Sequence, residues 1–217
     1  IVVGDFAQPD TFEEAAKKAH VVLHIGGMVG LKNGQALYDV NTKGTENLIN
    51  VLKASAVLER LVFISSIAAV DRPWETLKAS LAQGALTEDS TREPNTDYGK
   101  SKQQAEELIR TSGLPYTTLC PPYIYGPYPR QGSSMDKLVY DVISHKPYTR
   151  IPFPGEISEI YVEDLADAIW HVARHKAALN QTYFVSNPRP VTVEGFMRQI
   201  ALSHGTKYKP YPIPPSL

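Results

Sequence analysis

The sequence predicts an α/β fold built on a parallel β-sheet, and three observations indicate it. The chain has 217 residues, 42% of them apolar and 21% charged, which is enough to bury the core of one domain and a small lobe. Short β-branched runs alternate with segments of helical period. Two long connections follow directly after expected strands, at the edge where an open parallel sheet binds ligands.

The expected strands are short apolar runs, and segments of helical period lie between them. The strands are Ile1–Val3, Val21–Ile25, Arg60–Ile64, Tyr116–Cys120 and Thr182–Val185. The helices are Thr11–Ala19, Gln35–Ser55, Asn95–Ser112, Glu163–His175 and Thr192–His204. Gly113 and Pro115 end the third helix.

The two long connections interrupt this alternation. Asp71–Asn95 is polar and contains two prolines, and Cys120–Gly132 contains four prolines and three tyrosines. Loops of this length in an α/β domain are more often functional than mere linkers, so we expect them to border a site.

Charge and cysteine content exclude several classes of protein. Lys and Arg number 22 against 23 Asp and Glu, without a block of like charge, which argues against a nucleic-acid partner. The single cysteine, Cys120, cannot form an internal disulfide or a cysteine-based metal site. Leu61–Val70, the longest nearly apolar run, is about half of what a membrane span needs. We therefore expect no metal, no membrane span and a cytoplasmic location.

A tyrosine and a lysine lie four residues apart in the segment Tyr98-Gly99-Lys100-Ser101-Lys102. On a helix, this spacing places Tyr98 and Lys102 on one face. An ammonium beside a phenol favours the phenolate and lowers its pKa from about 10, which suits Tyr98 to acid/base chemistry. An ordinary amphipathic helix produces the same spacing by chance, so this motif alone does not decide the function.

Polar and small residues follow two of the expected strands. Ser65 and Ser66 follow a buried strand, where a hydroxyl could hold a substrate oxygen near Tyr98, although serines commonly end strands. Gly26 and Gly27 allow close approach of a flat or phosphorylated ligand, or form a simple turn.

Two further polar residues lie inside regular segments. His24 lies within a strand and reads as a core histidine rather than a catalytic group. Asn41 lies within a helical segment, where asparagine is unfavourable, and indicates a local distortion or a contact.

Seven segments, taken in order, resemble the extended short-chain dehydrogenase/reductase family, in its branch of NAD-dependent epimerases, dehydratases and 3-beta-hydroxysteroid dehydrogenase-like proteins. They are Gly4–Phe6, His24–Gly27, Asn41–Thr45, Phe63–Ser66, Tyr98–Lys102, Pro121–Pro127 and Tyr161–Leu165. The resemblance runs from Ile1 to about Phe196. It implies a Rossmann-type doubly wound parallel sheet in residues 1–125, and a small C-terminal substrate-binding lobe mainly in residues 126–217, with some segments returning to the core.

The resemblance also implies roles for individual residues. Tyr98 would be the general acid/base, Lys102 would lower its pKa and bind the nicotinamide ribose, Ser66 would orient the carbonyl, and Asn41 would support a proton-relay water. The cofactor would be NAD or NADP. Its expected contacts are Asp5, Phe6, Ile25, Gly26, Gly27, Ile64, Ser65, Tyr98, Lys102, Pro121, Tyr123 and Ile124.

The sequence departs from the family pattern at its start. The family's glycine-rich diphosphate loop is absent. If Ile1–Val3 is the third strand, two βα units of roughly 50–70 residues are missing, the sheet is N-terminally incomplete beside Ile1–Val3, and the chain alone is an inactive fragment. The residue that separates NAD from NADP is missing with them. Cys120 stands where relatives that bind sugar nucleotides carry arginine, which weakens that interpretation.

The leading hypothesis is an NAD(P)-dependent oxidoreductase that acts on a hydroxyl or carbonyl group of a small, apolar substrate by hydride transfer, with Tyr98 as acid/base. Alternatives are a nucleotide-sugar epimerase or dehydratase and a non-catalytic dinucleotide-binding relative. The family resemblance further implies a homodimer formed through Gln35–Ser55 and Asn95–Ser112, and hence an apolar outer stripe on both helices.

Overall fold

The computed structural model describes residues 1–30, 34–71, 86–129, 131–153 and 155–212. Contacts within the chain divide it into two compact units. Unit 1 comprises Ile1–Pro122 and Leu165–Val185, and unit 2 comprises Tyr123–Asp164 and Ser186–Leu217. None of the described helices is long and apolar enough to cross a membrane.

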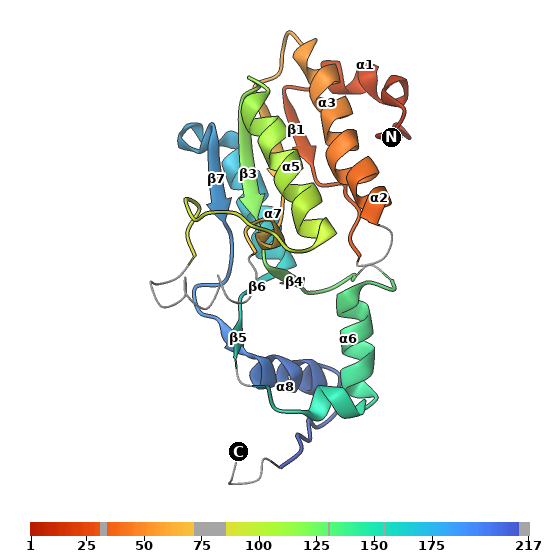
Figure 1. Ribbon diagram of the computed structural model, residues 1–217, viewed down its shortest axis with the longest axis vertical. Coiled ribbons are helices and arrows are strands. Elements are labelled where there is room, and N and C mark those ends of the chain that lie inside the picture. Colours follow the sequence, from red (N-terminus) through yellow and green to blue (C-terminus); the bar gives the residue numbers. More distant parts are fainter. Residues whose placement is uncertain (31–33, 72–85, 130, 154, 213–217) are drawn as a thin grey trace. The chain divides into compact units, whose positions relative to one another are not determined.

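Unit 1 contains a parallel sheet of four strands in the order β1-β2-β3-β7 (Figure 1). The strands are β1 (Val21–His24), β2 (Arg60–Ile64), β3 (Tyr116–Cys120) and β7 (Gln181–Phe184). Because all four run parallel, their carboxyl ends share one edge. The residues that follow β1, β2 and β3, namely Gly26, Ser66 and Pro121, therefore lie at the same edge of the sheet.

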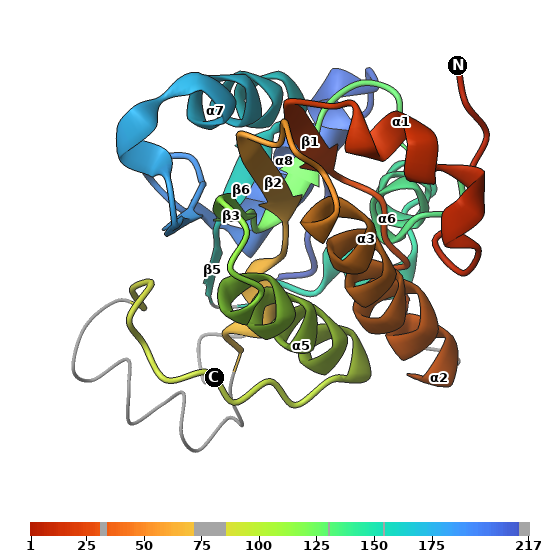
Figure 2. The same ribbon diagram turned by 90° about the horizontal axis from the view of Figure 1, so that it is seen from above.

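Helices cover both faces of this sheet, and the expected doubly wound α/β fold is confirmed. Figure 2 shows α3 (Gly44–Lys53) and α5 (Asp97–Thr111) on one face and α7 (Val162–Arg174) on the other. Residues of α3, β2 and α5 form the core of the first face: Leu48, Ile49, Leu52, Leu61, Phe63, Ala105 and Ile109. At the start of β2, the Arg60 guanidinium donates to the carbonyls of Val172 and His175 and so neutralises the end of α7.

Local signals define both ends of α5. The Thr96 hydroxyl accepts a 3.0 Å hydrogen bond from the Gly99 amide, which caps the first turn. After the helix, Gly113 has φ +78°, a left-handed conformation that glycine adopts without strain. A Cβ on Gly99 would lie 2.4 Å from the Ala68 carbonyl oxygen, so α5 begins in direct contact with the 3-10 turn η3 (Ile67–Ala69).

The long helix expected over Gln35–Ser55 is wrong as a single α-helix. The chain forms α2 (Gly34–Leu37), then a π-helical segment η2 (Tyr38–Lys43), then α3. The side chain of Asn41, within η2, bonds the Met28 backbone through both its oxygen and its nitrogen. We attribute the wider turn to this contact, since π-helical turns commonly occur where a residue serves a site rather than the helix.

The strand expected at Ile1–Val3 is also wrong. These three residues form no regular structure and are exposed, and the chain next forms η1 (Pro9–Thr11) and α1 (Glu13–Lys17), shorter than the expected helix Thr11–Ala19. A strand gains its hydrogen bonds from a neighbour, and no described segment lies beside this one. The expected N-terminal incompleteness of the sheet stays a prediction.

The expected apolar outer stripe is absent from α3 and α5. None of their large apolar side chains is exposed, and the outer surface of α5 carries Lys100, Gln104 and Glu107. The apolar side chains of both helices face the sheet instead. Homodimer formation itself stays a prediction.

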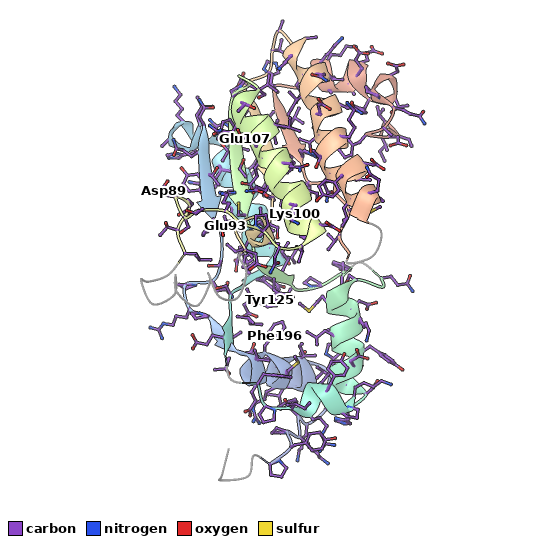
Figure 3. All side chains as sticks on the ribbon, viewed as in Figure 1. Asp89, Glu93, Lys100, Glu107, Tyr125 and Phe196 are labelled. Carbon is purple, nitrogen blue, oxygen red and sulfur yellow. The ribbon has the colours of Figure 1, made fainter. Side chains whose placement is uncertain are left out.

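Unit 2 has its own small core. Helices α6 (Ser134–Ile143) and α8 (Val193–Ser203) contribute Val142, Phe196, Ile200 and Ala201. Strand β4 (Tyr123–Tyr125) runs parallel to β6 (Glu159–Tyr161), and β5 (Glu156–Ile157) runs antiparallel to β8 (Val191–Thr192). The rings of Tyr125 and Phe196 meet edge to face, with centroids 6.5 Å apart (Figure 3). Two short 3-10 turns remain: η4 (Pro147–Arg150) belongs to unit 2, and η5 (Lys176–Ala178) belongs to unit 1.

Candidate active site

Helix α5 places Lys102 against the carboxyl end of β2. The Lys102 side chain is buried, its Nζ donates a 2.7 Å hydrogen bond to the Ile64 carbonyl, and it lies 4.3 Å from the centroid of the Phe63 ring. Burial disfavours the charged ammonium and lowers the pKa of Lys102 to about 8. The side chain therefore retains a charge at neutral pH only against a desolvation cost.

Tyr98 lies one turn before Lys102 and meets Ser66. Burial raises the pKa of the Tyr98 phenol, and a side-chain hydrogen bond with Ser66 partly offsets this by stabilising the phenolate. The expectation that Lys102 lowers the pKa of Tyr98 is not what this geometry gives. The reason is that the ammonium is bonded to the Ile64 carbonyl, while the phenol is itself desolvated.

The two serines after β2 have different surroundings. Ser65 is buried, and its hydroxyl donates to the carboxylate of Glu106. Ser66 is half-buried, its hydroxyl accepts a 3.2 Å bond from the Ala68 amide, and it is the serine of the pair that lowers the pKa of Tyr98. Only Ser66 of the pair therefore presents its hydroxyl beside the phenol.

Asn41 is the centre of a buried polar chain. Its Oδ1 accepts from the Met28 amide at 2.8 Å, and its Nδ2 donates to the Met28 carbonyl at 2.9 Å and to Ser101 Oγ at 3.0 Å. Ser101 Oγ in turn donates to the Tyr98 carbonyl at 2.8 Å. The amide of Asn41 thus holds the loop after β1 to the first turn of α5, and its role toward a proton-relay water stays a prediction.

His24 extends this chain into the sheet. Thr45 Oγ1 donates its proton to the Asn41 carbonyl at 2.6 Å. His24 Nε2 lies 2.8 Å from Thr45 Oγ1, so Nε2 carries the proton of the hydrogen bond between His24 and Thr45. Nδ1 is then an unprotonated acceptor, and it is buried without a partner among the described residues. Burial, with a smaller contribution from the nearby Lys102 charge, lowers the pKa of His24 to about 3. The expected core histidine is therefore neutral and satisfied at one nitrogen.

The residues expected along the adenosine half of a dinucleotide lie beside the end of β1. Asp5 is exposed, and its Oδ1 accepts a 2.9 Å bond from the Ala7 amide. The Phe6 ring packs edge-on against His24, with centroids 4.9 Å apart. A Cβ on Gly26 would lie 2.8 Å from the Phe6 ring, so only glycine brings the backbone this close to the aromatic side chain.

Gly27 continues this surface toward Lys102. A Cβ on Gly27 would lie 3.1 Å from Asn41 Oδ1 and 3.8 Å from Lys102 Nζ. Ile25, Gly26 and Gly27 are all exposed. Three exposed residues after β1 therefore lie between the Phe6 ring and the buried Lys102 ammonium.

Two of the remaining expected residues have carbonyls that accept bonds within unit 1, and two belong to unit 2. The Ile64 carbonyl is occupied by Lys102, and the carbonyl of buried Pro121 accepts a 3.0 Å bond from the Ile67 amide. Tyr123 and Ile124 belong to β4 of unit 2, where they are 55% and 40% exposed.

Two residues that the sequence analysis missed complete the surroundings of Ser65. Glu106 accepts from Ser65 and forms an ion pair with Arg92, and both charged side chains are largely buried. The signal was present in the sequence, because Glu106 repeats the four-residue spacing of Tyr98 and Lys102.

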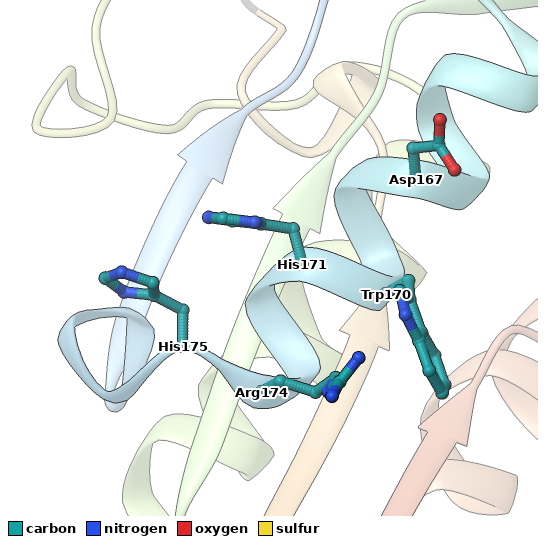
Figure 4. Close-up of a pocket in the computed structure, with 5 residues that line it drawn as sticks. All are labelled: Asp167, Trp170, His171, Arg174 and His175. Atoms are coloured by element: carbon teal, nitrogen blue, oxygen red, sulfur yellow. The ribbon is translucent and has the colours of Figure 1, made fainter.

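A separate hollow of about 510 Å³ lies on the surface of α7 (Figure 4). Its lining contains no residue expected at the site and consists of Asp167, Trp170, His171, Arg174 and His175. The two imidazoles stack 5.1 Å apart, and the Arg174 guanidinium lies 5.0 Å from the Trp170 ring.

Comparison with known proteins identifies the family of the chain. The model of the 3-beta hydroxysteroid dehydrogenase/isomerase family matches residues 1–214. The chain belongs to this family. The resemblance noted from the seven segments is thereby confirmed.

Curated relatives are about a quarter identical to the chain over the aligned residues. Short-chain dehydrogenase/reductase family 42E member 1 of Danio rerio is 27% identical over 241 residues, covering 99% of this chain and 59% of the relative. The 3beta-hydroxysteroid-dehydrogenase/decarboxylase isoform 2 of Arabidopsis thaliana is 27% identical over 215 residues, covering 92% and 36%. The chain spans 60% or less of the curated relatives it matches first.

Solved structures show the same fold. UDP-glucuronic acid 4-epimerase from Bacillus cereus, solved with UDP-glucuronic acid and NAD, superposes with a TM-score of 0.79 at 18% identity, covering 96% of this chain and 66% of that one. RMD from Pseudomonas aeruginosa, solved with NADPH, has a TM-score of 0.78 at 18% identity, covering 95% and 74%. The fold of the chain is thus shared with structures solved with NAD or NADPH bound.

Proposed function

We propose that the protein is an NAD(P)-dependent oxidoreductase that interconverts a hydroxyl and a carbonyl group. The observation that carries the proposal is the buried Lys102 ammonium, bonded to the Ile64 carbonyl at the end of β2 and one helical turn from the desolvated Tyr98 phenol. A binding module has no need of a desolvated phenol, hydroxyl and ammonium at one sheet edge, because each is costly to bury.

Tyr98 would exchange the proton. Since burial raises the pKa of its phenol, Tyr98 is protonated at neutral pH and is ready to donate to a carbonyl oxygen; in the reverse direction its phenolate removes the hydroxyl proton. Ser66 would hold the substrate oxygen at hydrogen-bonding distance from the phenol. Lys102 would stabilise the phenolate in the oxidation direction once its ammonium turns from the Ile64 carbonyl.

The dinucleotide would supply the hydride acceptor or donor, since no side chain can do so. The exposed backbone from Phe6 past Gly26 and Gly27 would hold its extended part, and Lys102 would reach its ribose hydroxyls. Asp5 at the far end offers a carboxylate for hydroxyl groups. Support comes from the glycine positions, where an added Cβ would collide with Phe6 or crowd Asn41.

We infer that the substrate is a small apolar molecule that carries one reacting hydroxyl or carbonyl. The family match supports this class, and so do relatives named as a 3beta-hydroxysteroid dehydrogenase/decarboxylase and a ceramide reductase. The epimerase and dehydratase structures share the fold alone, so they do not favour a nucleotide sugar.

Binding and turnover test the proposal on the full-length protein. We expect NADH or NADPH fluorescence to change on titration with the protein, and a panel of 3β-hydroxysteroids and long-chain secondary alcohols to yield absorbance at 340 nm with NAD or NADP (a property of the reduced cofactor). Lys102→Met should weaken dinucleotide binding, whereas Lys100→Met, on the exposed side of α5, should not. A protein that binds neither dinucleotide contradicts the proposal.

A further inference from the structure

A buried carboxylate extends the catalytic stripe of α5 by one more turn. Tyr98, Lys102 and Glu106 are spaced by four residues, so they lie along one face of the helix. The Glu106 side chain is 11% exposed, and that of its partner Arg92 is 19% exposed. Neither residue contacts the Tyr98 phenol, so the role of Glu106 must come from what its oxygens bind.

The two oxygens of Glu106 join three segments of unit 1. Oε1 accepts from Ser65 Oγ and lies 3.6 Å from Cys120 Sγ, at the ends of β2 and β3. Oε2 pairs with Arg92 Nη1 in the connection before α5, and the Arg92 carbonyl accepts a 3.1 Å bond from Gln103 on the helix. Glu106 thus anchors the residue that directly precedes Ser66.

Stability alone is a poor explanation for this network. A buried ion pair bears a desolvation cost that apolar residues of the same size avoid, so such a pair often contributes little to net stability. It does fix geometry, because a buried carboxylate tolerates few arrangements of its partners. Here the partner that it fixes is Ser65, whose peptide unit sets the position of Ser66.

We propose that Glu106 is a positioning residue, which holds Ser65 by a hydrogen bond so that the neighbouring Ser66 hydroxyl meets Tyr98, with Arg92 as its counter-charge. The inference rests on the proposed function, since it assigns to Glu106 the placement of the proposed catalytic hydroxyl. It does not require a known substrate, because the bond of Glu106 with Ser65 and the effect of Ser66 on the pKa of Tyr98 belong to the protein itself.

Titration of Tyr98 measures that contact directly. In protein labelled with ¹³C at the tyrosine ζ carbon, the Tyr98 resonance is assigned with Tyr98→Phe and followed by NMR against pH. Ser66→Ala removes the hydrogen bond that favours the phenolate, so the pKa of Tyr98 should rise by roughly 0.5 to 1 pH unit. Glu106→Gln should raise it in the same direction, because a displaced Ser66 loses the same bond.

The sign separates positioning from direct electrostatics. Removing the negative charge of Glu106 and freeing Arg92 both favour a phenolate nearby, so a direct effect would lower the pKa of Tyr98. Combined with Ser66→Ala, Glu106→Gln should add no further rise. A lowered or unchanged pKa in Glu106→Gln, or a rise that adds in full to that of Ser66→Ala, overturns the proposal.

Two further variants control for charge and for folding. Glu107→Gln removes the neighbouring carboxylate of α5 (Glu107 is labelled in Figure 3), which is 57% exposed and paired with Arg110, and should leave the Tyr98 titration unchanged. Ser65→Ala cuts the link while the ion pair of Glu106 and Arg92 stays, and should reproduce the rise even if Glu106→Gln does not fold. If Ser65→Ala leaves the pKa unchanged, the link is wrong, whatever dinucleotide binding shows about the proposed function.

Discussion

The Lys102 ammonium donates a 2.7 Å hydrogen bond to the Ile64 carbonyl, at the last residue of β2. This contact joins the proposed catalytic helix to the strand that carries Ser65 and Ser66. It also keeps a positive charge in a buried place, beside the Phe63 ring. The charge that the proposed function requires at Lys102 therefore lowers the stability of the protein, and a substitution of Lys102 can measure by how much.

Replacing Lys102 by methionine should stabilise the protein at neutral pH. The pKa of Lys102 is about 8 in the folded protein and about 10.5 when unfolded, so below pH 8 both states are charged and the folded state bears the whole desolvation cost. Removing the charge relieves this cost of roughly 3 kcal/mol, whereas losing the hydrogen bond to the Ile64 carbonyl destabilises the folded state by about 1 kcal/mol. We expect Lys102→Met to raise the free energy of unfolding by about 2 kcal/mol at pH 7, measured by urea denaturation.

The pH dependence distinguishes this cause from better packing. Between about pH 8 and 10.5 the folded state releases the proton first, so the wild type gains stability and the advantage of Lys102→Met should disappear. Lys100→Met, at an exposed position, should change little at any pH. An advantage that persists unchanged to pH 10.5 would show that the charge is not its source.

His24→Phe should make the protein more resistant to acid. The imidazole is neutral in the fold, with a pKa of about 3 against 6.5 when unfolded, so its contribution is complete above pH 6.5 and is lost as the pH falls toward 3. Phenylalanine fills the place between Phe6 and Phe63, and Thr45 keeps its bond to Asn41. The difference in free energy of unfolding between variant and wild type should grow by about 1 kcal/mol for each pH unit below 6.

His20→Phe is the matched control for this measurement. His20 is exposed and lies beside Glu59, outside the core. Its replacement should leave the acid dependence close to that of the wild type. If both histidine variants behave alike between pH 6.5 and 4, burial of His24 is not what makes the protein sensitive to acid.

Gly99→Ala should destabilise the protein, although alanine is the better helix former. In an open helix the exchange stabilises by about 1 kcal/mol. Here the new Cβ would lie 2.4 Å from the Ala68 carbonyl oxygen and 2.9 Å from Pro94, so the start of α5 must move. We expect a loss of about 2 kcal/mol in urea denaturation and a disturbed Tyr98 resonance. Lys100→Ala, at the next and exposed position, should be nearly neutral, and equal stabilities in both variants would contradict the close contact.

The sequence predicts those parts of the fold that depend on local pattern. Strands β2 and β3 and helix α5 lie within two residues of their expected ends, because apolar runs, Gly113 and the Thr96 cap act locally. The distortion or contact expected at Asn41 is confirmed by the π-helical segment, but its form could not be predicted, because it depends on Asn41 reaching the Met28 backbone. The strand at Ile1–Val3 failed for a similar reason, since strand formation depends on a neighbour rather than on the segment itself.

The same contrast between local patterns and long-range contacts applies to the site. The spacing of Tyr98 and Lys102 and the position of Ser66 after β2 follow from sequence. Whether the pKa of Tyr98 is raised or lowered depends instead on burial and on the partner of the Lys102 ammonium. Glu106 was missed because its partner Arg92 lies in an irregular connection, 14 residues away in sequence. A carboxylate that continues a catalytic stripe into the apolar face of a helix is the signal that could have revealed it.

Tyr98→Phe should abolish proton transfer and keep the ring. On a substrate that the full-length protein turns over, we expect kcat to fall by roughly 10²–10⁴-fold, while dinucleotide affinity changes little. Because oxidation needs the phenolate and burial raises the pKa of Tyr98, the wild-type oxidation rate should increase with pH above neutrality, and the residual rate of the variant should lose this dependence. Tyr140→Phe, at a 60% exposed position in α6, controls for loss of a hydroxyl. Turnover near that of the wild type in Tyr98→Phe would remove the acid/base assignment, and with it the strongest reason to treat this protein as an oxidoreductase rather than a dinucleotide-binding relative.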